Sequence, residues 1–391
     1  MPALPVFLDT STLPRDPRGM PLGFQRLCDL AQGSLVEVYL PEVVIHEWQG
    51  GFLDQLRKKI LEAERGLSRA LAHPWIEDLH CHNGLAAASA DMEGALEAAP
   101  GVVESRVTAL VHELRARVLP TGDGHARRVL AAYFAGAAPF SAPRSRADLP
   151  DAFVFECLRD LIPQLASPCQ CIVGDGALAS AILTLPHTAV YSSIDEFVTS
   201  EAVETLARQY DPDRLWASAF PAVVDYLGTV EHQISARVAS LLPDALGYAQ
   251  VQHQAIPDDT LEALVTGVYE PAEVALQWSG LRDFGAGLLE LPFSAECDAE
   301  IEFWVYRSEA FDVPLGVWVH YGDPELEHYF ESGGRVRLLV VGALGLTVHL
   351  SSPATGEGPD LADIVIDRID TTDILEDGEG LIFLLGPPAD S

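Results

Sequence analysis

PVFLDTST, residues 5–12, decides how the first part of the chain folds. A short apolar run leads directly into Asp9, and three hydroxyl residues that can begin a turn follow it. Such a run, bounded by turn-forming residues, is typical of a buried strand. The sequence therefore predicts a central strand with an acid at its carboxyl end.

Strand and helix patterns alternate after this first strand. The apolar spacing predicts a helix over residues 22–31 and another that begins near Glu42. Three further apolar runs are predicted as strands: residues 34–41, 169–175 and 187–193. This alternation favours an α/β fold with a parallel sheet flanked by helices, and we expect the domain to occupy residues 1–205.

A helical insertion is expected within this domain, over about residues 51–136. Residues 51–118 have the three-to-four spacing of amphipathic helices, and a further helix is predicted at residues 124–136. A polar, Pro-containing loop follows and ends at Asp151, at the start of a helix over residues 152–165.

The second half of the chain has a different pattern. Residues 206–290 are predicted to be a helical connecting region, and residues 291–391 a small, acidic, antiparallel β domain. Its strands are expected at residues 300–306, 314–321, 335–342, 346–350 and 362–369. Turns are expected at residues 332–334 and 356–358, where glycines gather.

The charge is strongly negative and unevenly spread. The chain has 24 basic and 58 acidic residues, a net charge of −34, of which −26 falls in residues 201–391. Such a charge repels nucleic acid, so we expect the acidic half to contact a basic protein partner or to screen the rest of the chain. A homodimer is left open. No apolar run is long enough to span a bilayer, so a cytoplasmic protein without a membrane partner is expected.

Four acids fall where a parallel sheet binds ligands, beyond the carboxyl ends of its strands. Asp9 and Asp175 each end a predicted strand, Glu47 lies about a turn and a half into a helix, and Asp151 begins one. Carboxylates gathered on an apolar scaffold repel one another unless a cation neutralises them. Mg²⁺ or Mn²⁺ would do so, and the implied chemistry is metal-assisted phosphodiester hydrolysis.

These acids stand in four short motifs that resemble those of the PIN-domain superfamily of nucleases, in the same order. The motifs are VFLDTST, PEVVIHE, DLPDAF and CIVGD, at residues 6–12, 41–47, 148–153 and 171–175. The loop before Asp151 and the long helical insertion resemble a bacterial PIN-like subfamily. The resemblance implies a flavodoxin-like fold and a Mg²⁺- or Mn²⁺-dependent endoribonuclease with RNA as its substrate. It also implies that Asp9, Glu47, Asp151 and Asp175 are the catalytic, metal-binding acids.

Several residues near these motifs are weaker candidates. Ser11 matches the polar residue after the first acid, and Arg144 and Arg146 lie in the loop before Asp151, where they could contact phosphates. Asp148 is left open as a further metal ligand. Gly174 stands where the family often has Ser, Thr or Asn.

Other interpretations remain beside the nuclease. Asp151 could be only a helix cap and Glu47 only a solvated helix residue. A haloacid-dehalogenase-like phosphatase would need an acid two residues after Asp9, where Ser11 stands. A catalytically weak PIN-like binding or regulatory module, whose acidic half contacts a partner protein, is the main alternative.

Overall fold

A computed structural model describes most of the chain, which divides into two compact units, Met1–Tyr210 and Asp211–Ser391. The described residues are 3–14, 20–72, 82–207, 211–247, 249–252, 256–257, 262–269, 273–310, 313, 316–320, 329–349, 363–374 and 381–383.

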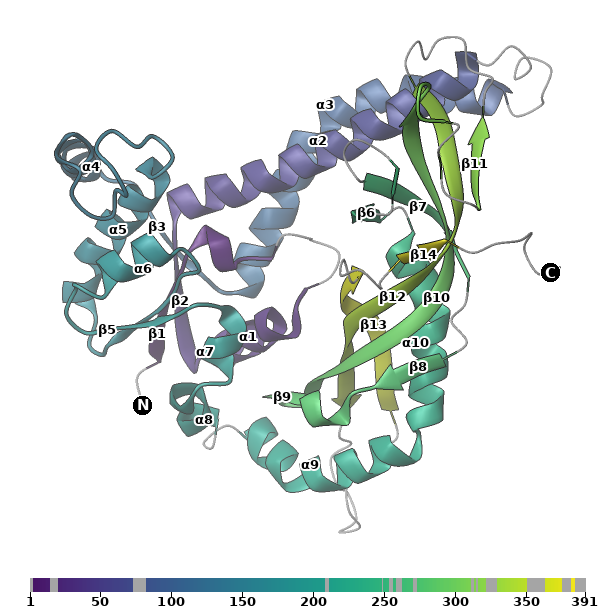
Figure 1. Ribbon diagram of the computed structural model, residues 1–391. Coiled ribbons are helices and arrows are strands. Elements are labelled where there is room, and N and C mark those ends of the chain that lie inside the picture. The colour runs from purple at the N-terminus through teal and green to yellow at the C-terminus, as the bar shows by residue number, and fades with distance from the viewer. Residues whose placement is uncertain are drawn as a thin grey trace. The chain divides into compact units, whose positions relative to one another are not determined.

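The first unit is built on a five-stranded parallel sheet, which confirms the predicted α/β fold (Figure 1). Its strands are β1 (Leu4–Leu8), β2 (Val36–Pro41), β3 (Arg117–Leu119), β4 (Cys169–Ile172) and β5 (Thr188–Tyr191). They lie side by side in the order β3-β2-β1-β4-β5. The sequence prediction missed β3, because three largely exposed residues carry little pattern of their own.

The first strand is central because both of its neighbours bury it. Val6, Phe7 and Leu8 are fully buried, and Phe7 pairs with Tyr39 on one side and Cys171 on the other. The backbone N–H of Asp9 donates to the carbonyl oxygen of Ile172 at 3.1 Å. The chain therefore leaves β1 beside the carboxyl end of β4.

Helices connect the strands of this sheet. They are α1 (Leu22–Gln32), α2 (Glu42–Ala72), α3 (His82–Glu113), α4 (Asp123–Ala135), α5 (Leu149–Leu161), α6 (Gly176–Ile182), α7 (Ile194–Val198) and α8 (Glu201–Ala207), with 3-10 turns at Thr10–Thr12 and Ile162–Gln164. Helix α1 contacts α7, while α5 contacts α2, α4 and α6.

The expected helical insertion begins as a pair of long helices. Figure 1 shows α2 leading away from the sheet and α3 returning beside it. Because β3 follows α3 and pairs with β2, the pair enters and leaves the sheet between neighbouring strands. Glu47 lies in the first turns of α2, so the helix that begins this insertion also carries a candidate site residue.

The second unit packs two helices, α9 (Asp211–Thr229) and α10 (Glu231–Leu246), with an antiparallel sheet. The prediction of helix over residues 206–290 is wrong beyond Leu246. Short strands follow instead: β6 (Gln250–Gln252), β7 (Glu262–Val268), β8 (Glu273–Leu276) and β9 (Arg282–Gly285). Their strand conformation depends on pairing with one another and with a later strand, which local composition does not reveal.

Two long strands form the centre of this sheet, β10 (Leu288–Tyr306) and β12 (Tyr329–His349). Buried and less buried residues alternate along β10, as expected where one face covers a core. The turn predicted at residues 332–334 is wrong, because these residues continue β12. A side chain at Gly333 would lie 2.4 Å from the Ile301 carbonyl oxygen and against the Trp318 ring, so glycine allows the close approach.

Three further strands complete the sheet: β11 (Val317–His320), β13 (Asp363–Ile374) and β14 (Leu381–Phe383), each paired with β12. The antiparallel β region predicted from the sequence is therefore confirmed. The turn predicted at residues 356–358 lies outside the described residues. None of the helices described is both long and apolar enough to cross a membrane.

Candidate functional site

The candidate site lies where the order of the parallel strands reverses. Strand β1 is followed along the chain by β2 on one side of it, whereas β4 lies on its other side. In open α/β sheets, ligands bind at such a point, beyond the carboxyl ends of the strands. Asp9 follows β1 here, and Asp175 lies three residues after the end of β4.

Asp9 is held deep at this edge. It is only 3% exposed and caps the 3-10 turn that follows, accepting hydrogen bonds at Oδ2 from the backbone and the hydroxyl of Ser11. Burial raises the pKa of Asp9 and outweighs the opposing effect of these hydrogen bonds, and the nearby charge of Asp175 raises it further. The carboxylate is thus oriented by its own turn and destabilised by its surroundings.

Ser11 joins the ends of the two central strands. While its hydroxyl donates to Asp9, it also accepts a hydrogen bond from the backbone N–H of Gly174 at 2.9 Å. A Cβ atom at position 174 would lie only 2.9 Å from this hydroxyl oxygen. A side chain at position 174 would therefore require Ser11 to move.

Glu47, on α2, is held at the site by Thr10, which the sequence predicted only as part of a turn. The Thr10 hydroxyl donates to Glu47 Oε2 at 2.8 Å. Burial raises the pKa of Glu47, with the charge of Asp9 adding to the effect and the Thr10 hydrogen bond opposing it. Its neighbour Trp48 serves packing, since the ring is buried against Phe24 and Phe52.

Asp151 lies in the first turn of α5, but it does not cap the helix. That position belongs to Asp148. Burial raises the pKa of Asp151 to about 7, and the charges of Asp9, Asp175 and Glu47 contribute in that order. No hydrogen bond from a described residue stabilises its ionised form. Asp151 is therefore a carboxyl that faces four others, Asp148 included, without a compensating hydrogen bond from the described residues.

Asp175 is more exposed than the other three acids. It caps α6, accepting a hydrogen bond at Oδ1 from the backbone N–H of Leu178 at 2.8 Å. Its charge nevertheless raises the pKa of both Asp9 and Asp151. A capping role and a place in the acidic cluster are thus combined in one side chain.

The four carboxyls offer only oxygen ligands, and their mutual repulsion would be relieved by a cation. Among the described residues, none of the four forms an ion pair with a basic side chain. This donor chemistry fits Mg²⁺ or Mn²⁺, which prefer carboxylate and water oxygens. Within the described part of the chain, however, no three His, Cys, Asp or Glu side chains already form a ligand group. Thr10, Ser11 and Leu178 instead hold three of the carboxyls.

Three of the weaker candidates, Asp148, Arg144 and Arg146, lie between α4 and α5. Asp148 accepts two hydrogen bonds at Oδ2 from the backbone and hydroxyl of Ser141, both at 2.7 Å, which lower its pKa. This contact gives Asp148 a role in holding the loop, and its role as a ligand stays a prediction. Arg144 and Arg146 are exposed in the same loop.

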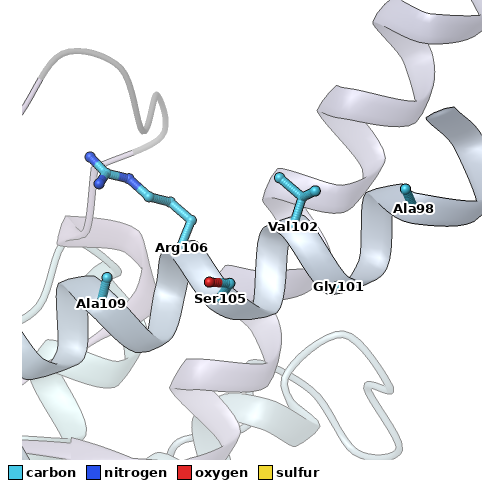
Figure 2. A pocket seen from close by; sticks show the side chains of 6 residues that line it. All are labelled: Ala98, Gly101, Val102, Ser105, Arg106 and Ala109. Carbon is cyan, nitrogen blue, oxygen red and sulfur yellow. The ribbon is translucent and has the colours of Figure 1, made fainter.

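A hollow elsewhere in this unit lacks the chemistry of the acidic site. Figure 2 shows it along one face of α3, where small side chains leave about 580 Å³ beside Arg106. No carboxylate lines this hollow. The acidic edge of the sheet is therefore the better candidate for the functional site.

Comparison with known families identifies the fold that carries these acids. Residues 6–170 match the PIN domain family. The first unit contains a PIN domain. Comparisons with curated proteins and with solved structures found no match.

The match fits the geometry of the sheet. It begins within β1 and ends within β4, the two strands whose carboxyl ends form the candidate site. Asp9, Glu47 and Asp151 lie inside the matched range, whereas Asp175 follows it by five residues. PIN domains form a superfamily of nucleases, so nucleic acid is the class of substrate that the family suggests for this PIN domain.

Proposed function

We propose that this protein is a metal-dependent ribonuclease that hydrolyses phosphodiester bonds at the acidic edge of its PIN domain. The observation that carries the proposal is the gathering of Asp9, Glu47, Asp151 and Asp175 where the order of the parallel strands reverses. The pKa of Asp151 is raised to about 7 by burial and by the charges of four neighbouring carboxylates, and no described basic residue compensates it. Such a cluster favours binding of a divalent cation.

Asp9, Glu47, Asp151 and Asp175 would hold Mg²⁺ or Mn²⁺, with Asp148 a further candidate. When bound, the ion would offset charge on the scissile phosphate and favour ionisation of a water molecule. Cation binding would also relieve the repulsion that raises the pKa of Asp151. Arg144 and Arg146 are proposed to contact phosphates of the substrate.

Two hydroxyl residues keep the acids oriented. Ser11 holds one oxygen of Asp9, and Thr10 holds one oxygen of Glu47. The hydrogen bonds from Ser11 use only Oδ2 of Asp9, and the hydrogen bond from Thr10 uses only Oε2 of Glu47. The turn after β1 thus orients acids from two elements that are far apart in the sequence.

The test is cleavage of a fluorescent single-stranded RNA by the full chain with Mn²⁺, Mg²⁺ or EDTA. Asp9→Asn and Asp151→Asn remove the charge while preserving side-chain shape, and Asp91→Asn, at an exposed position in α3, is the matched control. We expect Mn²⁺-dependent cleavage in the wild-type chain and the control, and its loss in both site variants. Isothermal titration should show Mn²⁺ binding that is lost in the same variants.

Cleavage that persists in EDTA, or equally in Asp9→Asn and Asp151→Asn, would contradict the proposal. A covalently closed circular RNA distinguishes the mode of attack, because an endonuclease cuts it and an exonuclease, which needs a free end, does not. Deoxyribonucleotide strands of the same sequence test the preference for RNA.

A second candidate function is a PIN-like binding or regulatory module. It is favoured by the hydrogen bonds that occupy three of the acids and by the lack of a formed ligand group among the described residues. A binding module should show no Mn²⁺ binding at millimolar concentration and no cleavage. Mn²⁺-dependent cleavage that requires Asp9 and Asp151 decides for the nuclease.

The acidic second half is proposed to contact a basic protein partner or to screen the nuclease site. Screening is electrostatic, so rising salt should then weaken RNA cleavage by the full chain less than it weakens cleavage by a variant with neutralised acids in α9 and α10. Equal salt dependence would exclude screening. Sedimentation of the full chain tests the homodimer.

A further inference from the structure

An exposed apolar and basic face lies on α4, beside the loop that leads to Asp151. Leu130 and Phe134 are 51% and 63% exposed, and Arg127 is also exposed. Their spacing of three and four residues places them on one side of the helix. Because α4 already buries Val129 against its own unit, this outer face adds nothing to the core.

An arginine from the loop covers part of the exposed ring. The guanidinium carbon of Arg144 lies 5.9 Å from the centroid of Phe134. Tyr133 contacts the same ring edge to face, with centroids 5.2 Å apart and planes at 74°. Phe134 is thus held in place on two sides while most of its surface stays accessible.

The loop that presents Arg144 is firmly built. Arg144 has a φ of 63°, a conformation that favours glycine, and its backbone N–H donates to the carbonyl oxygen of Tyr133 at 2.9 Å. Phe140 is buried from the same loop against Val129 and Ala152. The backbone therefore fixes a large charged side chain at a position that a smaller residue would occupy more easily.

The arginines of this face are available to an anionic ligand. Among described residues, Arg127, Arg144 and Arg146 form no ion pair, although the chain carries a net charge of −34. By contrast, Arg128 and Arg159 both bind the buried carboxylate of Glu156. Arg128 and Arg159 therefore serve the packing of the unit, whereas the arginines of the outer face have no described acidic partner.

The face is connected directly to the proposed catalytic edge. The carbonyl oxygen of Arg146 accepts a hydrogen bond from the backbone N–H of Leu149 at 3.3 Å, at the start of α5. Asp151 lies in the same first turn. The loop arginines therefore lie at the entrance to the helix that carries Asp151, with Arg146 five residues before it in the chain.

We propose that Phe134 is a stacking platform for an unpaired base of the RNA substrate, with Arg144 and Arg146 contacting the adjoining phosphates. This inference rests on the proposed ribonuclease function and names the single-stranded form of its substrate. Exposed aromatic rings beside arginines bind single strands because every base offers a flat face and every phosphate a charge. A protein partner would need a larger apolar area than two side chains on a helix of 13 residues.

The test measures binding without cleavage. The full chain is titrated in EDTA against a fluorescein-labelled single-stranded RNA of about 12 nucleotides, and binding is followed by anisotropy at low salt. Phe134→Leu removes the ring but keeps an apolar side chain, and Phe134→Trp restores a ring. Tyr226→Leu is the matched control, since Tyr226 is another exposed aromatic residue, 38% accessible, in the second unit. Thermal melting checks that each variant is folded.

We expect Phe134→Leu to weaken binding about fivefold or more, the lower end for loss of one base–aromatic stack. Phe134→Trp and Tyr226→Leu should bind as the wild type does. An otherwise identical RNA with abasic sites should bind Phe134→Leu and the wild type equally. Arg144→Gln should weaken binding and reduce the dependence of log affinity on log salt by about 0.7, the value for one single-strand phosphate contact.

Unchanged RNA binding by Phe134→Leu would overturn the proposal, as would an equal loss toward the normal and the abasic strand. Loss only of self-association or of binding to anionic lipid vesicles would assign the face to a different partner. The nuclease proposal fails separately: strand binding that depends on Phe134 without any Mn²⁺-dependent cleavage would leave a binding protein. Cleavage with an unaltered KM in Phe134→Leu would exclude the stacking role alone.

Discussion

The hydroxyl oxygen of Ser11 lies 2.9 Å from the backbone nitrogen of Gly174 and accepts its hydrogen bond. Gly174→Ala should therefore displace Ser11 and, through it, Asp9, because the added Cβ would lie at the same 2.9 Å from that oxygen. We expect Mn²⁺ affinity to fall about tenfold or more, as for other residues that orient metal ligands. Isothermal titration measures the change.

Gly176→Ala is the matched control, since a Cβ there would meet nothing within 4 Å. Ser11→Ala should cause a similar loss of Mn²⁺ affinity. If both changes act through Asp9, the double variant should lose less than the two single losses combined. Full additivity would show that Gly174 acts by another route.

Metal-free stability should depend on Asp151. Its pKa is raised from 3.8 to about 7 in the folded protein, so the folded state binds more protons than the unfolded state between these values. The contribution of Asp151 to stability is therefore fully present below pH 4 and is lost as pH rises through about 7. Melting temperature measured in EDTA across this range should reveal it.

Asp151→Asn should flatten that part of the pH profile, because an amide does not ionise. In the wild-type chain, Mn²⁺ should raise the melting temperature more at pH 8 than at pH 5, since metal binding favours ionised carboxylates. An equal effect of Mn²⁺ at both values would argue against Asp151 as a ligand.

Thr10 should matter through its hydrogen bond to Glu47. Thr10→Val keeps the shape of the side chain but removes the donor, so the pKa of Glu47 should rise and the carboxylate should lose its orientation. We expect slower RNA cleavage, with the loss greatest at low pH. Thr10→Ser keeps the donor and serves as the control, and an equal loss in both variants would show that the hydroxyl is not the cause.

Gly333 should limit the stability of the second unit. Gly333→Ala would place a methyl group 2.4 Å from the carbonyl oxygen of Ile301 and 2.6 Å from the Trp318 ring. We expect the free energy of unfolding to fall by about 1–3 kcal/mol, as for overpacked cores. Chemical denaturation followed by tryptophan fluorescence measures it.

Gly228→Ala is the opposite case in the same unit. Gly228 lies in α9 with open space around it, so alanine should raise stability by up to about 1 kcal/mol. A stabilising effect of Gly333→Ala would contradict the close approach between β10, β11 and β12.

The first unit could be predicted from its sequence because its pattern is local. The apolar run before Asp9 forms the buried strand β1. The runs that form β2 and β4 pair with it in one parallel sheet. Strands buried on both sides carry the same signal whatever their partners are. The four acids are brought into electrostatic contact as that topology requires, while their roles as ligands stay predictions.

Other features depend on partners that are distant in sequence. The hydrogen bond from Thr10 to Glu47 spans 37 residues and has no sequence signature. The strands between Gln250 and Gly285 take their conformation from pairing with one another and with β10. The glycines at residues 333 and 334 are typical of a turn, but Gly333 lies within β12, where the Trp318 ring packs closely against it. Context overrode local preference at each of these places.

The hydrogen bond from the Asp9 backbone to the Ile172 carbonyl joins two segments that are far apart in the sequence, so the acidic cluster requires both to have been synthesised. Asp9 is synthesised before its neighbouring strand β4 and Asp175, which follow only after the whole helical insertion. A nascent chain that ends before β4 therefore has no complete acidic cluster. The acidic edge is therefore assembled only after β4 has been synthesised and has paired with β1.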